Sequence, residues 1–231
     1  MELSISEIRN KEAWQQKGYE LPDFDIESVK KRTLQEPMWL HFGAGNIFRA
    51  FPAVMQQTLL NESLSDKGII VCESYDEEII EKAYTPFENL SLLVTLKSDG
   101  SIGKKVVASV IHGISTKGNM HELEEIFISP SLQIVSFTIT EKGYSLTDNQ
   151  GHYFPQVIRE FENIHEEPKS LMGIIANLCY KRYLQGKLPI ALVSMDNCSH
   201  NGAKLYEAVR TFADNWVDKG LVDKGFLDYI D

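Results

Sequence analysis

The sequence predicts an α/β protein built on a doubly wound, mainly parallel sheet with an inserted hairpin. Apolar runs of strand length alternate with amphipathic runs of helix length along the chain, as in parallel strands joined by crossover helices. The run 132–140 is β-branched and apolar in its first half, as expected of a central strand covered on both faces. The pair Asp99-Gly100 lies between two strand-like runs and favours a hairpin.

The first part of the chain sets the expected domain organisation. Residues 1–36 are polar and partly helical in pattern and form a lead-in, and residues 37–231 form the α/β domain. That domain opens with a strand at 38–42, a glycine-rich turn and a helix at about 50–60. Pro52 delays the start of regular helix or kinks it, because proline lacks the backbone N–H.

The remaining elements follow from the same signals. Further strands are expected at 69–73, 90–96, 105–111, 132–140 and 189–195, and further helices at 76–84, 119–128, 171–184 and 201–219. The strand 189–195 should be buried, since it is apolar nearly throughout. Gly186 should end the preceding helix from the C′ position.

Composition excludes several classes of protein. The 231 residues are 43% hydrophobic and 24% charged, the balance of a folded globular chain. The net charge of −10 has the wrong sign for a nucleic-acid binder. The longest apolar run, Leu188–Val193, is far too short to span a membrane, and the N-terminus shows no apolar signal-peptide region, so we expect a cytoplasmic protein. The three cysteines lack a C-x-x-C pair and should be reduced, buried thiols.

The segment HFGAGNIFRA follows the first strand of the domain and is a candidate dinucleotide loop. Gly43 and Gly45 would let the backbone turn tightly and approach a pyrophosphate. Phe48 stands where the third glycine of G-x-G-x-x-G would lie, so a purely structural glycine turn is the alternative. Arg49 favours the binding interpretation, because a guanidinium pairs with phosphate. We take Asn46, Phe48 and Arg49 as further cofactor contacts.

Glu73 ends the next strand, about 30 residues after Gly43, near the place of the acid that binds the cofactor ribose in dinucleotide-binding folds. A carboxylate there accepts from the 2′-hydroxyl and repels a 2′-phosphate. No arginine lies between Arg49 and Arg159, which favours NAD over NADP. Asp76 could take this role instead, and a helix-capping acid is the structural alternative for both.

The segment TITEKGY brings polar residues abruptly to the end of the strand 132–140. Ligands bind beyond the carboxyl ends of parallel strands, so Thr140 is a candidate cofactor contact there. Lys142 could act as a general base only if burial lowered its pKa strongly. An exposed loop lysine is the more ordinary interpretation.

The segment SMDNCSHNG places polar residues between the strand 189–195 and the last long helix. Asn197 is the candidate catalytic residue, because a side-chain amide at a strand tip can donate to a developing alkoxide. Asn201 has helix capping as its alternative role. A metal site built from Asp196, His200 and His41 is a further alternative, although the ligand spacing matches no known signature.

The glycine loop, TEKGY and DN-x-x-x-NG, in this order and at roughly these separations, resemble the polyol-specific long-chain dehydrogenases of the mannitol dehydrogenase family, which includes fructuronate and tagaturonate reductases. The glycine loop is also similar to that of mannitol-1-phosphate dehydrogenase, in the same superfamily. The resemblance covers about 39–231 and corresponds to the family's N-terminal, Rossmann-like NAD-binding domain. It implies reversible, metal-independent hydride transfer between NAD(H) and a sugar-derived polyol or uronate, of the D-mannonate/fructuronate or mannitol/fructose type.

Carried over by position, the resemblance assigns Gly43, Gly45 and Arg49 to the cofactor loop and makes Asn197 one of two asparagines in an oxyanion hole. The family's general base is a lysine in a helical C-terminal domain that follows an FP-x-x-MVDRI-like segment. The chain ends at LDYID before any such segment, so we expect a piece of a longer protein that is inactive alone. The open alternatives are a non-catalytic NAD-binding module and a metal-dependent hydrolase; the oligomeric state is not predicted.

Overall fold

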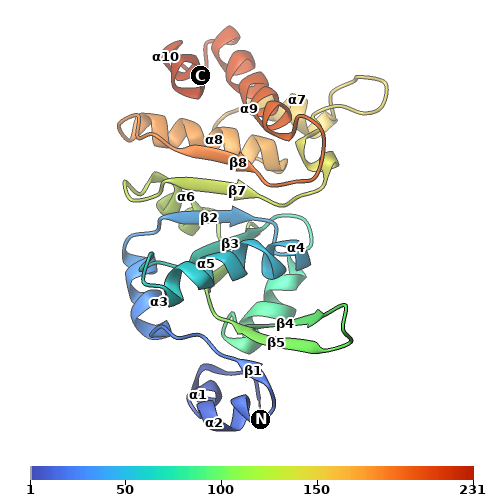
Figure 1. Cartoon of the computed structure of the whole chain (residues 1–231). Helices are drawn as coiled ribbons and strands as arrows, with labels where there is room; N and C mark the ends of the chain where they lie inside the picture. Colours follow the sequence, from blue (N-terminus) through green and yellow to red (C-terminus); the bar gives the residue numbers. More distant parts are fainter. Residues whose placement is uncertain (1) are drawn as a thin grey trace. The chain divides into compact units, whose positions relative to one another are not determined.

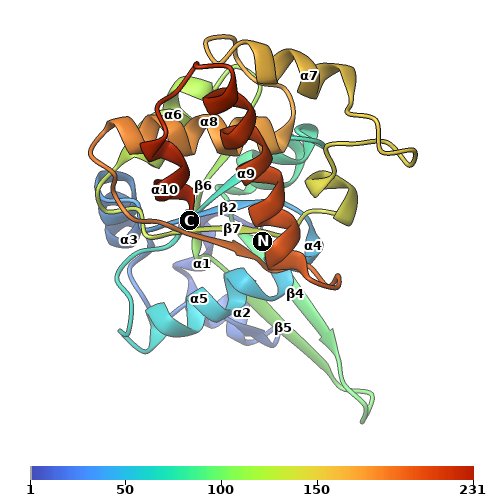
Figure 2. The same cartoon turned by 90° about the horizontal axis from the view of Figure 1, so that it is seen from above.

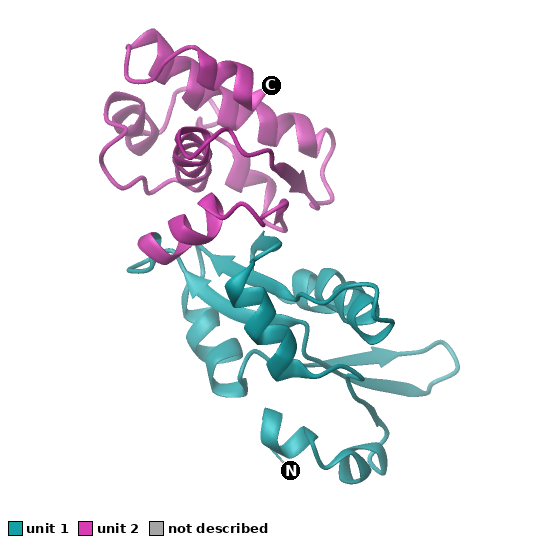
Figure 3. Ribbon diagram, turned by 90° about the vertical axis from the view of Figure 1, so that its left-hand side faces the viewer, with its two compact units in different colours: residues 1–120 teal, residues 121–231 magenta. Residues whose placement is uncertain are grey.

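The computed structural model describes residues 2–231 and divides into two compact units, residues 1–120 and residues 121–231 (Figure 3). Both units contain parallel strands and helices. The fold is α/β, Rossmann-like and mainly parallel with one antiparallel hairpin, which confirms the predicted class. The boundaries 1–36 and 37–231 remain a prediction.

The first unit is built around three parallel strands in which β3 (Ile69–Glu73) lies between β2 (Trp39–Phe42) and β6 (Val110–Ser115). Every residue of β3 is buried, as expected of an all-apolar strand covered on both faces. The bounds of β3 agree with the sequence prediction. Its carboxyl end therefore brings Glu73 next to the end of β2, where the glycine turn begins.

The helices of the first unit begin with α1 (Ile5–Ile8), α2 (Lys11–Gln15) and α3 (Ile26–Gln35). After the glycine turn come α4 (Asn46–Ala50) and α5 (Pro52–Asn61), which are separated at Phe51. This break confirms the expected effect of Pro52. The predicted helix 76–84 is a π-helical turn, Ile80–Tyr84, followed by the 3-10 turn Thr85–Phe87.

A hairpin of β4 (Ser91–Leu96) and β5 (Ile102–Val107) extends away from the three parallel strands (Figures 1 and 2). The short strand β1 (Tyr19–Glu20) pairs with β5 in parallel. Gly100 at the hairpin tip has a φ of +83°, the left-handed backbone that an Asp-Gly turn requires. The sequence prediction of a hairpin at this pair is confirmed.

The predicted single strand 105–111 is wrong, because β5 ends at Val107 and β6 begins at Val110. The buried side chain of Gln57 in α5 causes the separation. Its amide nitrogen donates to the carbonyl oxygen of Val106 at 2.7 Å, and its amide oxygen accepts from the Ala108 N–H at 2.6 Å. These bonds replace strand pairing at the junction.

The second unit pairs β7 (Ile134–Phe137) with β8 (Ala191–Ser194) in parallel. Its helices are α6 (Met120–Ile128), α7 (Pro155–Glu162), α8 (Leu171–Leu184), α9 (Asn201–Asp218) and α10 (Gly225–Ile230), with a 3-10 turn at Glu141–Tyr144. Figure 1 shows α8 beside β8. The bounds of α8 match the prediction, and the predicted closing residue Gly186 has a φ of +133°.

A buried arginine forms hydrogen bonds to two separate segments of the second unit. Arg182 of α8 is 1% exposed, and its guanidinium donates to backbone carbonyl groups that precede β7 and β8. The acceptors are the oxygens of Phe127, Ser129, Leu132, Leu188 and Pro189, at 2.6 to 3.0 Å. The charge is buried without a carboxylate partner in this set, so these carbonyl dipoles compensate its lost hydration.

Two sequence expectations about burial need correction. The strand predicted at 189–195 is not fully buried: β8 is an edge strand, and Val193 and Met195 are 36% and 38% exposed. An apolar run predicts burial, but the chain has no further strand beside β8 within residues 2–231. All three cysteines are free, as predicted, but only Cys72 and Cys179 are buried.

No helix within residues 2–231 has the length and apolar character needed to cross a membrane.

Candidate functional site

The turn after β2 is shaped by its two glycines. Gly43 is buried and has a φ of +108°, a backbone conformation that only glycine adopts without strain. Its N–H donates to the carbonyl oxygen of Cys72 in β3 at 2.9 Å. A Cβ placed on Gly45 would have no heavy atom of residues 2–231 within 4 Å. The turn therefore leaves open space directly above the Gly45 backbone.

The Glu73 side chain stabilises this turn by hydrogen bonds to its backbone. The residue is 9% exposed, and one oxygen of its carboxylate accepts from the Ala44 N–H at 2.8 Å. The other oxygen accepts from the N–H groups of Ser74 and Tyr75, each at 3.0 Å. Three backbone donors thus hold the carboxylate at the end of β3. A ribose hydroxyl would have to share oxygens that already carry these bonds, whereas the alternative acid Asp76 is exposed.

Arg49 lies in the last turn of α4 and contacts two side chains of the same unit. Its Nη2 donates to Asn46 Oδ1 at 2.6 Å, and its guanidinium carbon lies 5.7 Å from the centre of the Tyr84 ring. The buried Arg49 Nε has no hydrogen-bond partner among the described residues. Tyr84 donates its hydroxyl to the Ala44 carbonyl oxygen at 2.8 Å, and burial raises its pKa. No local sequence signal points to Tyr84, because the turn that it contacts lies 40 residues earlier in the chain.

Phe48 and His41 belong to the core rather than to an exposed binding surface. Their rings stack with centroids 4.2 Å apart, and both residues are 0% exposed. The Phe48 ring packs inward from the position of the missing third glycine and offers no exposed side chain to a cofactor, and a cofactor contact at Phe48 stays a prediction. Burial lowers the pKa of His41 to about 3, so this imidazole is neutral at physiological pH.

The end of β7 leads into the 3-10 turn Glu141–Tyr144. Thr140 is exposed immediately before this turn, and its carbonyl oxygen accepts from the Gly143 N–H at 2.7 Å. Lys142 is exposed, which favours the ordinary loop lysine over a buried general base. Tyr144 is 4% exposed, and its hydroxyl contacts Ser194 at the end of β8 and Asp196 just after it.

The segment after β8 presents Asn197 on a braced backbone. The Asn197 side chain is exposed and makes no hydrogen bond to any described residue. The carboxylate of Asp196 accepts from the Tyr144 hydroxyl and from the Ile139 N–H, the latter at 3.1 Å. Burial raises the pKa of Asp196, and the bond from Tyr144 partly opposes that shift.

Asn201 does not occupy the cap position expected of it: it is the first residue of α9, and its Oδ1 accepts from the Gly202 N–H at 2.7 Å. The cap position of α9 is His200, with a φ of +55° and no side-chain cap bond. Asn201 instead donates its amide to the carbonyl oxygens of Ser194 at 3.3 Å and Asp196 at 2.8 Å. It thereby fixes the segment that carries Asn197.

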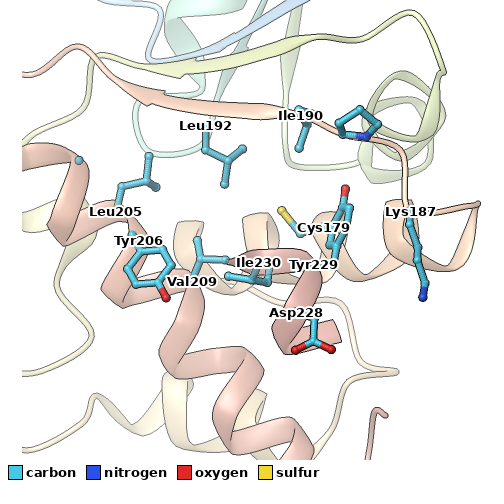
Figure 4. Close-up of a pocket in the computed structure, with 12 residues that line it drawn as sticks. Cys179, Lys187, Ile190, Leu192, Leu205, Tyr206, Val209, Asp228, Tyr229 and Ile230 are labelled. Atoms are coloured by element: carbon cyan, nitrogen blue, oxygen red, sulfur yellow. The ribbon is translucent and has the colours of Figure 1, made fainter. Parts of the chain in front are cut away.

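The second unit also contains a pocket of about 420 Å³. Figure 4 shows Ile190 and Leu192 facing it from β8 and its preceding loop, with Cys179 opposite. The lining is mostly apolar and includes none of the residues predicted from the sequence to bind or react. Within residues 2–231, no group of three or more His, Cys, Asp or Glu side chains is placed to hold a metal ion.

The fold is a Rossmann-like domain of the nucleotide-binding type. Its parallel strands are joined by helices, a glycine turn follows one strand, and an acid ends the neighbouring strand. The chain belongs to the mannitol dehydrogenase family: residues 37–226 match the model of the mannitol dehydrogenase Rossmann domain. This match confirms the resemblance stated from the motifs.

Individual relatives agree with this assignment. The D-mannonate oxidoreductase of Thermotoga maritima is 45% identical over 234 residues, which cover 100% of this chain and 43% of that protein. The polyol:NADP oxidoreductase of Gluconobacter oxydans is 25% identical, covering 88% of this chain and 44% of that one. The structure of Pseudomonas fluorescens mannitol 2-dehydrogenase with NAD and D-mannitol superposes with a TM-score of 0.78 at 24% identity, over 96% of this chain and 44% of that chain. The chain thus spans less than half the length of these relatives.

Proposed function

We propose that this chain is the NAD(H)-binding part of an oxidoreductase that transfers a hydride between NAD(H) and a sugar-derived polyol or uronate. The observation that carries the proposal is the glycine turn: it leaves open space above Gly45, and it occurs in a chain of the mannitol dehydrogenase family. Backbone that can be approached this closely suits a pyrophosphate.

The residues of the turn fit such a cofactor. Gly43 and Gly45 would let the pyrophosphate approach the backbone, and Arg49 would supply positive charge beside it, with Asn46 orienting the guanidinium. The buried Arg49 Nε without a partner is a donor that an anionic ligand could use. Thr140, which is exposed three residues after β7, is the contact proposed for the nicotinamide side.

We further propose a preference for NAD over NADP. Glu73 places a negative charge at the end of β3, and Asp76 adds a second, exposed carboxylate shortly after it. Both would repel a 2′-phosphate, and no arginine lies between Arg49 and Arg159 to neutralise it. The name of the Gluconobacter relative includes NADP, so cofactor choice varies among relatives and needs direct measurement.

NADH, held by the glycine turn and Arg49, would supply the hydride that reduces a ketone carbon. Asn197 donates its side-chain amide to the ketone oxygen, where negative charge develops. That oxygen also needs a proton, and the exposed Lys142 is a poor candidate for the donor. We therefore infer that the acid and base lie outside these 231 residues and that the isolated chain binds NADH without turnover.

For the substrate we favour the D-mannonate/fructuronate type over the mannitol/fructose type. The support is the 45% identity to the D-mannonate oxidoreductase of Thermotoga maritima. Substrate discrimination would depend in part on residues beyond this chain, since the chain covers 43% of that relative.

The test combines binding and turnover. Titration with NADH should quench the protein fluorescence of the isolated chain. The isolated chain should oxidise NADH at a negligible rate with fructuronate, tagaturonate or fructose. A longer protein that includes this chain should reduce at least one of these ketones. NADH binding without turnover in the longer protein would support the non-catalytic module instead, and stoichiometric metal with no NADH binding would support the hydrolase.

A further inference from the structure

We propose that Tyr144 is a positioning residue for Asn197: its hydroxyl holds the turn after β8 so that the Asn197 amide faces the reacting oxygen. The inference rests on the proposed oxidoreductase function and on the role of Asn197 in it. It also joins two separate sequence motifs, TEKGY and DN-x-x-x-NG, in one hydrogen-bonded unit.

The first support is the set of bonds on the side chain of Asp196, the neighbour of Asn197. The Tyr144 hydroxyl reaches this carboxylate and also lies 2.7 Å from Ser194 Oγ. The Ile139 N–H donates to the same carboxylate oxygen at 3.1 Å. Two residues that follow β7, Ile139 and Tyr144, thereby hold the residue immediately before Asn197.

The second support is the set of bonds on the backbone of the same turn. The Met195 N–H donates to the Phe137 carbonyl oxygen at 2.8 Å, continuing the pairing of β7 with β8. Asn201 holds the carbonyl oxygens of Ser194 and Asp196 from the start of α9. The backbone before Asn197 is therefore fixed on both sides, while the Asn197 side chain stays exposed without a bond to the described residues.

Burial decides that Tyr144 acts through its neighbours rather than on a substrate. The residue is 4% exposed, and burial, followed by the bond to Asp196, raises the pKa of its hydroxyl. The hydroxyl thus remains a protonated donor at physiological pH. By donating to the Asp196 carboxylate it also offsets a negative charge that lies next to the proposed alkoxide site.

The experiment removes one hydroxyl. In a longer active protein that includes this chain, Tyr144→Phe should lower kcat about 10- to 100-fold, the range for a misplaced catalytic group, with the Kd for NADH unchanged within about twofold. Tyr183→Phe is the matched control, since it removes a hydroxyl that donates to Asp223 Oδ1 at 2.7 Å in the same unit. Its kcat should equal that of the unmutated protein.

Two further readouts separate positioning from general destabilisation. Because Tyr144 acts through Asn197, the double variant Tyr144→Phe, Asn197→Ala should be no slower than Asn197→Ala alone. The inference would be overturned if the two substitutions together lowered kcat by the product of their separate effects. An unchanged kcat in Tyr144→Phe would also overturn it. If Tyr144→Phe does not fold by circular dichroism, Asp196→Asn replaces it: it keeps an acceptor for Tyr144 and should retain most of kcat, whereas Asp196→Leu should not.

A measurement on the isolated chain is independent of turnover. Amide hydrogen exchange across 194–198 should be faster in Tyr144→Phe than in Tyr183→Phe or the unmutated chain. Equal exchange would reject the positioning role of Tyr144 even in an active enzyme. The unmutated longer protein could also fail to reduce any ketone while the exchange difference is present. That result would reject the proposed function but would still show that Tyr144 holds the segment 194–198.

Discussion

Replacing Gly45 with valine should remove NADH binding while leaving the fold intact. A Cβ at Gly45 meets no heavy atom of residues 2–231 within 4 Å, and its φ of −74° is open to any residue. The valine side chain would instead fill the space proposed for the pyrophosphate. Gly43 offers no such clean test, because its φ of +108° makes any side chain costly to the fold.

The magnitude follows from these geometries. Gly45→Val should change the free energy of unfolding by less than about 0.5 kcal/mol, as for an unstrained surface substitution. Two backbone hydrogen bonds to a charged phosphate are worth about 3 kcal/mol together, so their loss weakens NADH binding at least about 100-fold. Gly43→Val should destabilise the fold by about 1–3 kcal/mol or more, the cost of a strained backbone.

The assay measures urea unfolding and NADH affinity on the same samples. Gly103→Val in β5 is the control and should preserve both properties. A Cβ added at Gly103 would lie 3.6 Å from the nearest neighbouring atom, which is an ordinary contact distance. NADH affinity within about threefold of the unmutated chain in Gly45→Val would refute the cofactor role of this turn and leave it a structural feature.

Four further results are expected. Glu73→Gln should reduce the preference for NADH over NADPH by about 1–3 kcal/mol in parallel titrations; a loss confined to Asp76→Asn would move the ribose role to that exposed acid. Because burial lowers the pKa of His41 to about 3, the unfolded state takes up the proton first as pH falls below about 6.5. The contribution of His41 to the free energy of unfolding should therefore decline by about 1.4 kcal/mol per pH unit from there toward pH 3, and urea unfolding of His41→Phe should lack that contribution. Arg182→Met should destabilise the chain by at least about 4 kcal/mol in denaturant unfolding, since five carbonyl groups lose a charged donor; a change below about 1 kcal/mol would show that water replaces it freely. In a longer active protein, Asn197→Ala should lower kcat about 10² to 10³-fold with unchanged NADH affinity, and an unchanged kcat would remove Asn197 from the reaction.

The fold class, the family and most of the regular elements could be predicted from the amino-acid sequence. The bounds of β3 and α8 could be read directly, because apolar runs, helical periodicity and a closing glycine are local signals. The glycine turn and the segment around Asn197 could be located for the same reason. Each follows a strand, and the ends of parallel strands are where ligands bind.

The contacts that hold these segments in place could not be predicted from the sequence, because they join residues far apart along the chain. Gln57 separates β5 from β6 by bonds to residues about 50 positions away, and Tyr144 reaches Asp196 across 52 positions. Glu73 proved to brace the glycine turn through three backbone N–H groups. Buried polar groups must find partners wherever the folded chain supplies them, and those partners are set by three-dimensional proximity, which local sequence patterns do not encode.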